Sequence, residues 1–241
     1  MEELWFEEEL TLDEEVVSLS VKELTNNRET QSAYANEIRQ LVRGVVQADK
    51  PRWQVLTAEQ KPLQSGTKSR FYLVRLGYQF YVPREAHEKG TRFIFGRCEA
   101  HLRAANPGQP HPSVYQVIPD MIVEGEPRKV TIKLGPEITV GDYGGSLGEI
   151  STDVMIGLIT PAVTGWPGEE EREPFWELRP INKDLTGTQH LWLIVDVPNN
   201  CQAFRLSSRV EGDVQTKFGP FGIGPKEKLW DNRPSVVIEA T

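Results

Sequence analysis

The sequence predicts a mostly β protein: an antiparallel β-sandwich of about nine strands with an N-terminal helical, acidic extension. Three observations support this prediction. Apolar residues alternate with polar ones from about residue 70 onward, clusters of glycine and proline separate the alternating runs, and helical spacing occurs only before residue 50. A chain of 241 residues can bury a sizeable core without a disulfide or metal.

Period-two alternation predicts the strands, because successive side chains of a strand point to opposite faces. The predicted runs are 71–82, 92–104, 114–123, 129–134, 148–159, 174–180, 191–197, 201–210 and 234–240. The apolar phase of these runs predicts a core that includes Val74, Leu76, Phe80, Leu102, Leu191, Leu193 and Val195. Pro119 fits an edge strand or a bulge better than a central strand.

Residues 1–50 have a different pattern. Helical spacing connects Tyr34, Ile38, Leu41, Val42 and Val45, and Pro51 ends this predicted helix. The run 14–24 is compatible with either a short strand or a helical turn. We therefore expect an acidic segment and amphipathic helix over 1–50, a linker over 51–69 and the sandwich over 70–241.

All of the net charge lies at the N-terminus. The chain has 35 acidic and 27 basic residues, a net charge of −8, and residues 1–15 contain eight acids and no base. The remaining residues are electrically balanced, which argues against a dedicated nucleic-acid-binding protein, because such a protein needs a basic surplus.

Apolar residues are interspersed among these N-terminal acids. Leu4, Trp5, Phe6 and Leu10 predict a docking element separate from the sandwich core, fitted to a surface with a basic rim and an apolar centre. That surface belongs to this chain, a second copy or another protein. Trp192 lies on the strand face opposite Leu191 and Leu193, so it is a fifth candidate for partner binding, with burial as the alternative.

The sequence predicts a cytoplasmic protein. The N-terminus is acidic, unlike a secretory signal, and no run approaches the ~20 apolar residues of a membrane-spanning helix. Cys98 and Cys201 are far apart in the sequence and are expected to be reduced thiols.

Catalytic and metal motifs are weak. Residues 144–148 match G-x-S-x-G, and Asp184 and His190 follow Ser146 in the order of an α/β-hydrolase, but a strand rather than a helix is predicted next. Cys98 and His101 are three residues apart on a strand and so point to opposite faces. We expect no catalytic serine, no metal and no cofactor.

These observations favour a non-catalytic protein-interaction module, an accessory or structural component of a larger assembly, with a protein partner or self-association through edge strands. One alternative is a carbohydrate- or small-ligand-binding sandwich that uses its aromatic loops. A second is a serine hydrolase built on Ser146.

Overall fold

The computed structural model describes residues 3–62, 68–122, 128–134, 139–142, 153–159, 162–180, 184–185, 187–225 and 229–240. The described strands form three antiparallel sheets, here named A, B and C. Sheet A has the order β1 (Leu4–Thr11), β2 (Arg43–Val55), β3 (Ser69–Tyr81), β12 (Thr188–Pro198) and β5 (Ser113–Ile118). The predicted fold class is confirmed: the chain is mostly β and sandwich-like, with a small helical N-terminal part.

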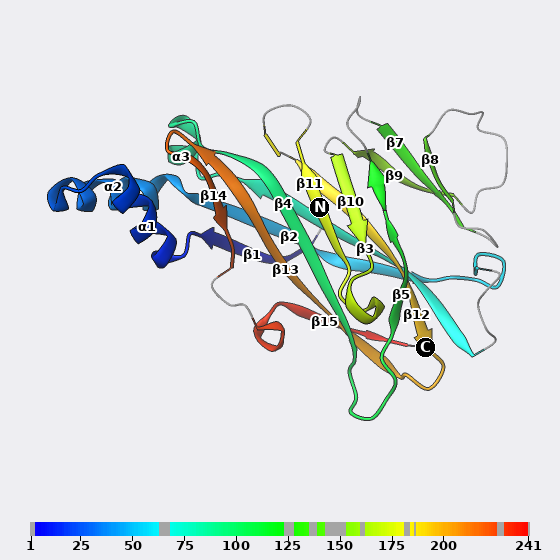
Figure 1. Cartoon of the computed structure of the whole chain (residues 1–241). Coiled ribbons are helices and arrows are strands. Elements are labelled where there is room, and N and C mark those ends of the chain that lie inside the picture. Colours follow the sequence, from blue (N-terminus) through cyan, green and yellow to red (C-terminus); the bar gives the residue numbers. More distant parts are fainter. Residues whose placement is uncertain are drawn as a thin grey trace.

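Sheet B has the order β14 (Gly219–Ile223), β13 (Ala203–Thr216), β4 (Arg92–Ala104), β11 (Phe175–Arg179), β10 (Ala162–Trp166) and β6 (Met121–Ile122). Strand β15 (Ser235–Glu239) also pairs with β13. Sheet C consists of β8 (Thr139–Asp142), β7 (Arg128–Lys133) and β9 (Asp153–Ile159). Figure 1 shows sheet C at the end of the molecule opposite the N-terminal helices.

The core lies between sheets A and B. All seven core residues predicted from the alternation are buried, namely Val74, Leu76, Phe80, Leu102, Leu191, Leu193 and Val195. Ile194 and Leu73 point away from this core, yet they are also buried. Strand β9 lies against β12, and Ile132 of β7 is buried in the same cluster, so sheet C covers part of the outer face of sheet A.

The described helices are α1 (Glu14–Leu24), α2 (Arg28–Leu41), α3 (Arg84–Glu88) and the short 3₁₀ turns η1 (Glu169–Glu171) and η2 (Trp230–Asn232). The run 14–24, compatible with a strand or a helix in sequence, is helical. Asp13 caps it by accepting a hydrogen bond from the Glu15 N–H at 3.0 Å. None of the helices in the described ranges is long and apolar enough to cross a membrane.

The structure corrects the expected division of the chain. The helix ends at Leu41, and Val45 and Pro51 belong to β2, so the expected boundary at residue 50 falls inside a strand. Gly44, just after the helix, packs closely on sheet B, since a Cβ there would lie 2.2 Å from the Phe93 ring. A register shift between Asp49 and Arg52 accommodates the proline.

The N-terminal segment is also not separate from the sandwich. Residues 4–11 form β1, which pairs along β2 at the edge of sheet A, and Leu10 is fully buried. Thr11 and Gly224 exchange backbone hydrogen bonds of 3.1 and 3.2 Å, which join the edge of sheet A to β14 of sheet B.

Pro119 lies where the chain passes from β5, at the edge of sheet A, to β6, at the edge of sheet B. The position matches the expectation of an edge or irregularity. The single run predicted over 114–123 is thus two strands in different sheets.

Candidate binding groove on sheet B

A groove of about 700 Å³ lies on the outer face of sheet B, over β14. Its floor contains Gly222 and Gly224. A Cβ at Gly222 would lie 3.3 Å from the Asp213 carboxylate, and one at Gly224 would lie 3.9 Å from the Cβ of Glu211, so a side chain at either position would take up space beside these two acids. The absence of side chains at these two positions creates the space.

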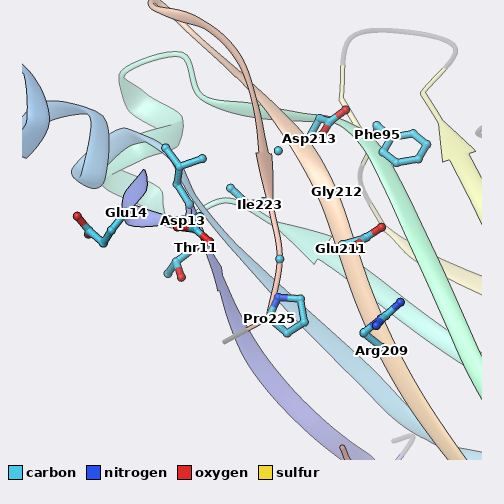
Figure 2. A pocket seen from close by; sticks show the side chains of 13 residues that line it. Thr11, Asp13, Glu14, Phe95, Arg209, Glu211, Gly212, Asp213, Ile223 and Pro225 are labelled. Atoms are coloured by element: carbon cyan, nitrogen blue, oxygen red, sulfur yellow. The ribbon is translucent and has the colours of Figure 1, made fainter. Parts of the chain in front are cut away.

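Two walls flank this floor (Figure 2). One is the turn of residues 11–14 that leads from β1 into α1, and the other is formed by Phe95 of β4 and Arg209, Glu211 and Asp213 of β13. The three residues of β13 share the outer face because they are spaced by two, while Val210 and Val214 point into the core.

The groove is acidic, since four carboxylates line it against one guanidinium. That guanidinium, on Arg209, is already paired with Glu99. Glu14 is held by Arg39 at 2.7 Å, and this hydrogen bond lowers the pKa of Glu14 and raises that of Arg39. Among the residues that the structure describes, none forms an ion pair with Asp213.

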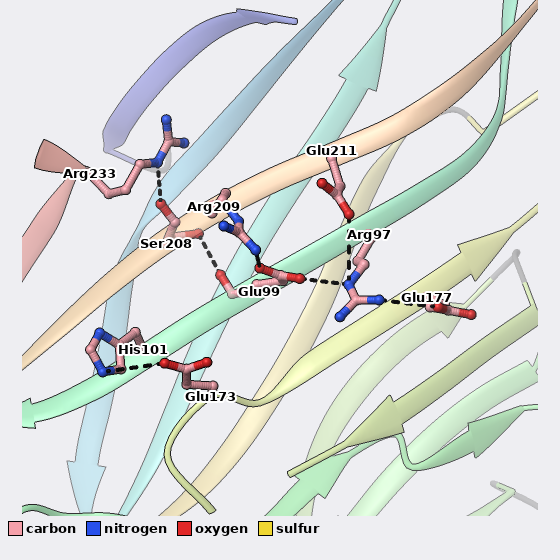
Figure 3. Close-up of polar contacts among 9 residues, drawn as sticks. All are labelled: Arg97, Glu99, His101, Glu173, Glu177, Ser208, Arg209, Glu211 and Arg233. Atoms are coloured by element: carbon pink, nitrogen blue, oxygen red, sulfur yellow. Dashed lines mark hydrogen bonds and ion pairs between the residues drawn. The ribbon is translucent and has the colours of Figure 1, made fainter. Parts of the chain in front are cut away.

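Beside the groove, a network of charged residues crosses β11, β4 and β13 (Figure 3). Glu99 is nearly buried and accepts hydrogen bonds from Arg97, at 2.6 Å, and from Arg209. Arg97 also lies 3.6 Å from Glu177 and 3.9 Å from Glu211. Because two arginines satisfy Glu99, the network fixes the groove wall at Arg209 and Glu211.

Aromatic rings cover the two arginines. The guanidinium of Arg97 stands 4.0 Å from the centre of the Phe175 ring, and that of Arg209 stands 5.1 Å from the centre of the Trp230 ring. Such stacking orders an arginine without removing its charge. The aromatic residues of this face therefore hold the charged network in place.

His101 lies at the far end of this network, 3.8 Å from Glu173, with its ring 5.2 Å from that of Trp230. Burial lowers the pKa of His101, and the nearby charges of Arg103 and Arg172 lower it further. This histidine therefore favours the neutral form at neutral pH.

The five residues predicted to bind a partner lie outside the groove. Leu4 is exposed, Trp5 and Phe6 are half-buried with their rings in an edge contact at 5.3 Å, and Trp192 is half-buried against the core. Leu10 is fully buried, so it stabilises the fold and offers no surface to a partner.

Bases of this chain pair with three of the N-terminal acids. Glu3 pairs with Lys50 at 3.0 Å, Glu9 with Arg43, and Glu8 with the buried Arg233.

The sequence alternation contained a signal for the groove: the run 209–214 alternates charged and core residues, and glycines stand at alternate positions 222 and 224. The glycine and proline cluster at 219–224 does not merely separate strands, since most of it forms β14.

Four of the catalytic and metal candidates, Asp184, His190, Cys98 and His101, lie in the described residues. Ser146 lies outside the described residues, and Asp184 stands 3.7 Å from Arg92. Cys98 is buried in the core, while His101 is on the outer face of β4, as the odd spacing predicts. Both cysteines are buried free thiols, and burial raises their pKa values.

No protein family model matches the sequence, and the search of curated proteins finds no match. Among solved structures, the delta-toxin of Clostridium perfringens is similar, with a TM-score of 0.45 and 7% identity over 81% of this chain and 82% of that chain. A pore-forming protein has a TM-score of 0.36 and 7% identity, over 81% of this chain and 90% of its own. The NetB toxin of C. perfringens in its membrane-inserted form has a TM-score of 0.33 and 7% identity, over 82% and 88%. At TM-scores below 0.5, these similarities assign neither a family nor a function to this chain.

Proposed function

We propose that the protein is a non-catalytic interaction module, a component of a larger assembly, that binds a positively charged segment of a partner protein in the groove over β14. The observation that supports this proposal is the groove itself, which is open along its glycine floor and lined by carboxylates. Asp13 and Asp213 have no ion-pair partner in the described part of the chain, and Asp13 is used to cap α1, which leaves Asp213 for a partner.

A lysine or arginine side chain matches this geometry. Its methylene groups can lie against Phe95, and its charged end can reach Asp213 and Glu211 along the same wall. Opposite charge across such a site raises the association rate and fixes the register of the partner, and added salt weakens it.

The proposal is tested by calorimetric titration with pentalysine, with pentaglutamate as the control peptide. Pentalysine is expected to bind, and Asp213→Asn is expected to weaken binding about tenfold, because one close charge pair contributes on the order of 1.4 kcal/mol or more. Glu59→Gln makes the same change of charge at an exposed position outside the groove and should leave the affinity unchanged. Equal affinities for the two variants would contradict the groove as the site.

A carbohydrate ligand is the second candidate, favoured by Trp166. This side chain is 59% exposed on the outer face of sheet B, and Phe175 is its neighbour across the strand pair β10–β11. Flat exposed indole rings stack on sugar rings, and the carboxylate of Glu177 lies on the same face, where it can accept hydrogen bonds from sugar hydroxyls. A shift in tryptophan fluorescence on adding an oligosaccharide, lost in Trp166→Ala, would support this candidate.

A further inference from the structure

The apolar part of the surface of helix α1 is wider than the part that the helix buries against the core. Val17 and Val21 pack into the core, whereas Val16, Leu19 and Leu24 are exposed by 41%, 61% and 45%. At about 100° per residue, these three exposed residues span a sector of roughly 140° that adjoins the buried one. We call these three residues the α1 stripe.

Polar groups within the α1 stripe are few and mostly satisfied. Ser20 lies between Val16 and Leu24 on the helix surface, and its hydroxyl donates a hydrogen bond to the carbonyl of Val16 at 2.9 Å. The hydroxyl is thus used within the helix. Glu23 is the one charged residue inside the sector.

The described part of the chain leaves this sector open. Helices α1 and α2 lie together at one end of the molecule, beyond the two large sheets (Figure 1). The Glu14–Arg39 ion pair joins α2 to the N-terminal turn of α1, on the side away from the α1 stripe. An apolar helix face left open in this way is typical of a docking surface.

Charge identifies the kind of occupant. Glu23 lies inside the sector of the α1 stripe and Glu15 borders it, both exposed, with Lys22 as the nearest base. A second copy of this chain would bring another acidic molecule of net charge −8, and an anionic lipid surface would repel the same carboxylates. A basic partner is the one that these charges attract.

We propose that the α1 stripe docks an amphipathic helix of another protein, one that has apolar side chains on one face and lysine or arginine along its flanks. Helices dock in this way through apolar residues spaced by three and four, which is the spacing of Val16 and Leu19, and Leu24 follows two turns after Val16. With 11 residues, α1 is about 16 Å long, so about three turns of the partner helix cover it. This surface is additional to the groove over β14.

The test uses a fluorescein-labelled 18-residue helical peptide of leucine and lysine, with a peptide in which glutamate replaces each lysine as the control. Fluorescence anisotropy should show binding of the leucine–lysine peptide, weakened about tenfold or more in the double variant Val16→Ser/Leu19→Ser. Val237→Ser is the matched control, because Val237 is equally exposed, at 41%, but lies on β15. Asp213→Asn, which disables the groove, should change this affinity much less than the stripe variant does.

Four outcomes would overturn the proposal. The first is no binding of the leucine–lysine peptide below about 1 mM, and the second is equal affinity of this peptide for the stripe variant and for the Val237→Ser control. The third is that the leucine–glutamate peptide binds as tightly as the leucine–lysine peptide. The fourth is that another occupant binds the protein and loses this binding in the stripe variant. The alternative occupants are a second copy, detected by sedimentation, and phosphatidylserine vesicles, detected by flotation. Circular dichroism of the variants checks that α1 is still folded.

Discussion

At the scale of single residues, two nearly buried charges in the described ranges, Glu99 and Arg233, each have an ion-pair partner far away in the sequence. Arg233 is almost fully buried and forms two hydrogen bonds with the Glu8 carboxylate, and its Nε donates to the Ser208 carbonyl at 3.2 Å. The Ser208 hydroxyl lies 2.7 Å from that of Tyr78. This chain of contacts joins β1 to β13 and to the segment before β15.

Arg233→Met should therefore be strongly destabilising. Removing one partner leaves the carboxylate of Glu8 partly buried and unpaired, and the expected loss is about 3 kcal/mol of unfolding free energy. Urea denaturation measures the change. Lys50→Met, which breaks the exposed Glu3–Lys50 pair, serves as the control and should cost less than about 1 kcal/mol.

His101 makes stability depend on pH. Its pKa in the folded state is below 6.5, mainly because of burial, so the unfolded state binds more protons on acidification. The stability contributed by neutral His101 is complete above pH 6.5 and is lost as the pH falls through the lower folded pKa. His101→Gln should flatten this slope, measured by urea midpoints from pH 7.5 downward, whereas the exposed His87→Gln should not. A proton NMR titration giving a pKa of 6.5 or higher for His101 would contradict the argument.

At the scale of elements, the strands with clean alternation were predictable from sequence, and β1 was not. In β12 and β3 the apolar phase alone places Leu193 and Val74 in the core. Strand β1 has three consecutive glutamates, which no local pattern assigns to a strand. Glu7 accepts hydrogen bonds from Gln47 and Tyr81, and Glu8 points to Arg233, 225 residues away. Such partners are fixed by tertiary structure, so the sequence alone could not reveal them.

Inward-pointing Glu8 has a second consequence at the sheet edge. A charge on the inner side of an edge strand disfavours pairing with another chain.

The groove was as hard to predict from the sequence as β1, because it requires β14 to lie between β13 and the Thr11–Glu14 turn. Gly222 and Gly224 could not be assigned to the floor of a groove before that arrangement was known.

Deletion of residues 1–11 should destabilise the whole domain. It removes buried Leu10, takes away the partner of Arg233 and exposes the edge of β2. The melting temperature should fall by well over the roughly 2–4 °C that a loss of 1 kcal/mol causes in a chain of this size, or the unfolding transition should lose its cooperativity. Deletion of residues 1–3, which removes the exposed Glu3–Lys50 pair, is the control. An unchanged melting temperature after the longer deletion would mean that β1 is dispensable.

At the scale of the whole molecule, the acidic surplus is divided between stability and the candidate site. Glu8 and Glu9 of β1, and Glu3 just before it, pair with this chain's own bases, at Arg233, Arg43 and Lys50. The carboxylate of Asp213 in the groove has no such partner in the described ranges. The uneven charge seen in the sequence thus appears as an internally neutralised strand beside an acidic groove.

The central claim is that this groove receives a cationic segment, and an NMR map of the amide groups tests it most directly. On titration of isotope-labelled protein with pentalysine, the largest shift changes should fall on Gly212, Asp213, Gly222 and Gly224, and should fade with added salt. Changes confined to strands outside the groove, or saturable binding that does not respond to salt, would contradict the claim.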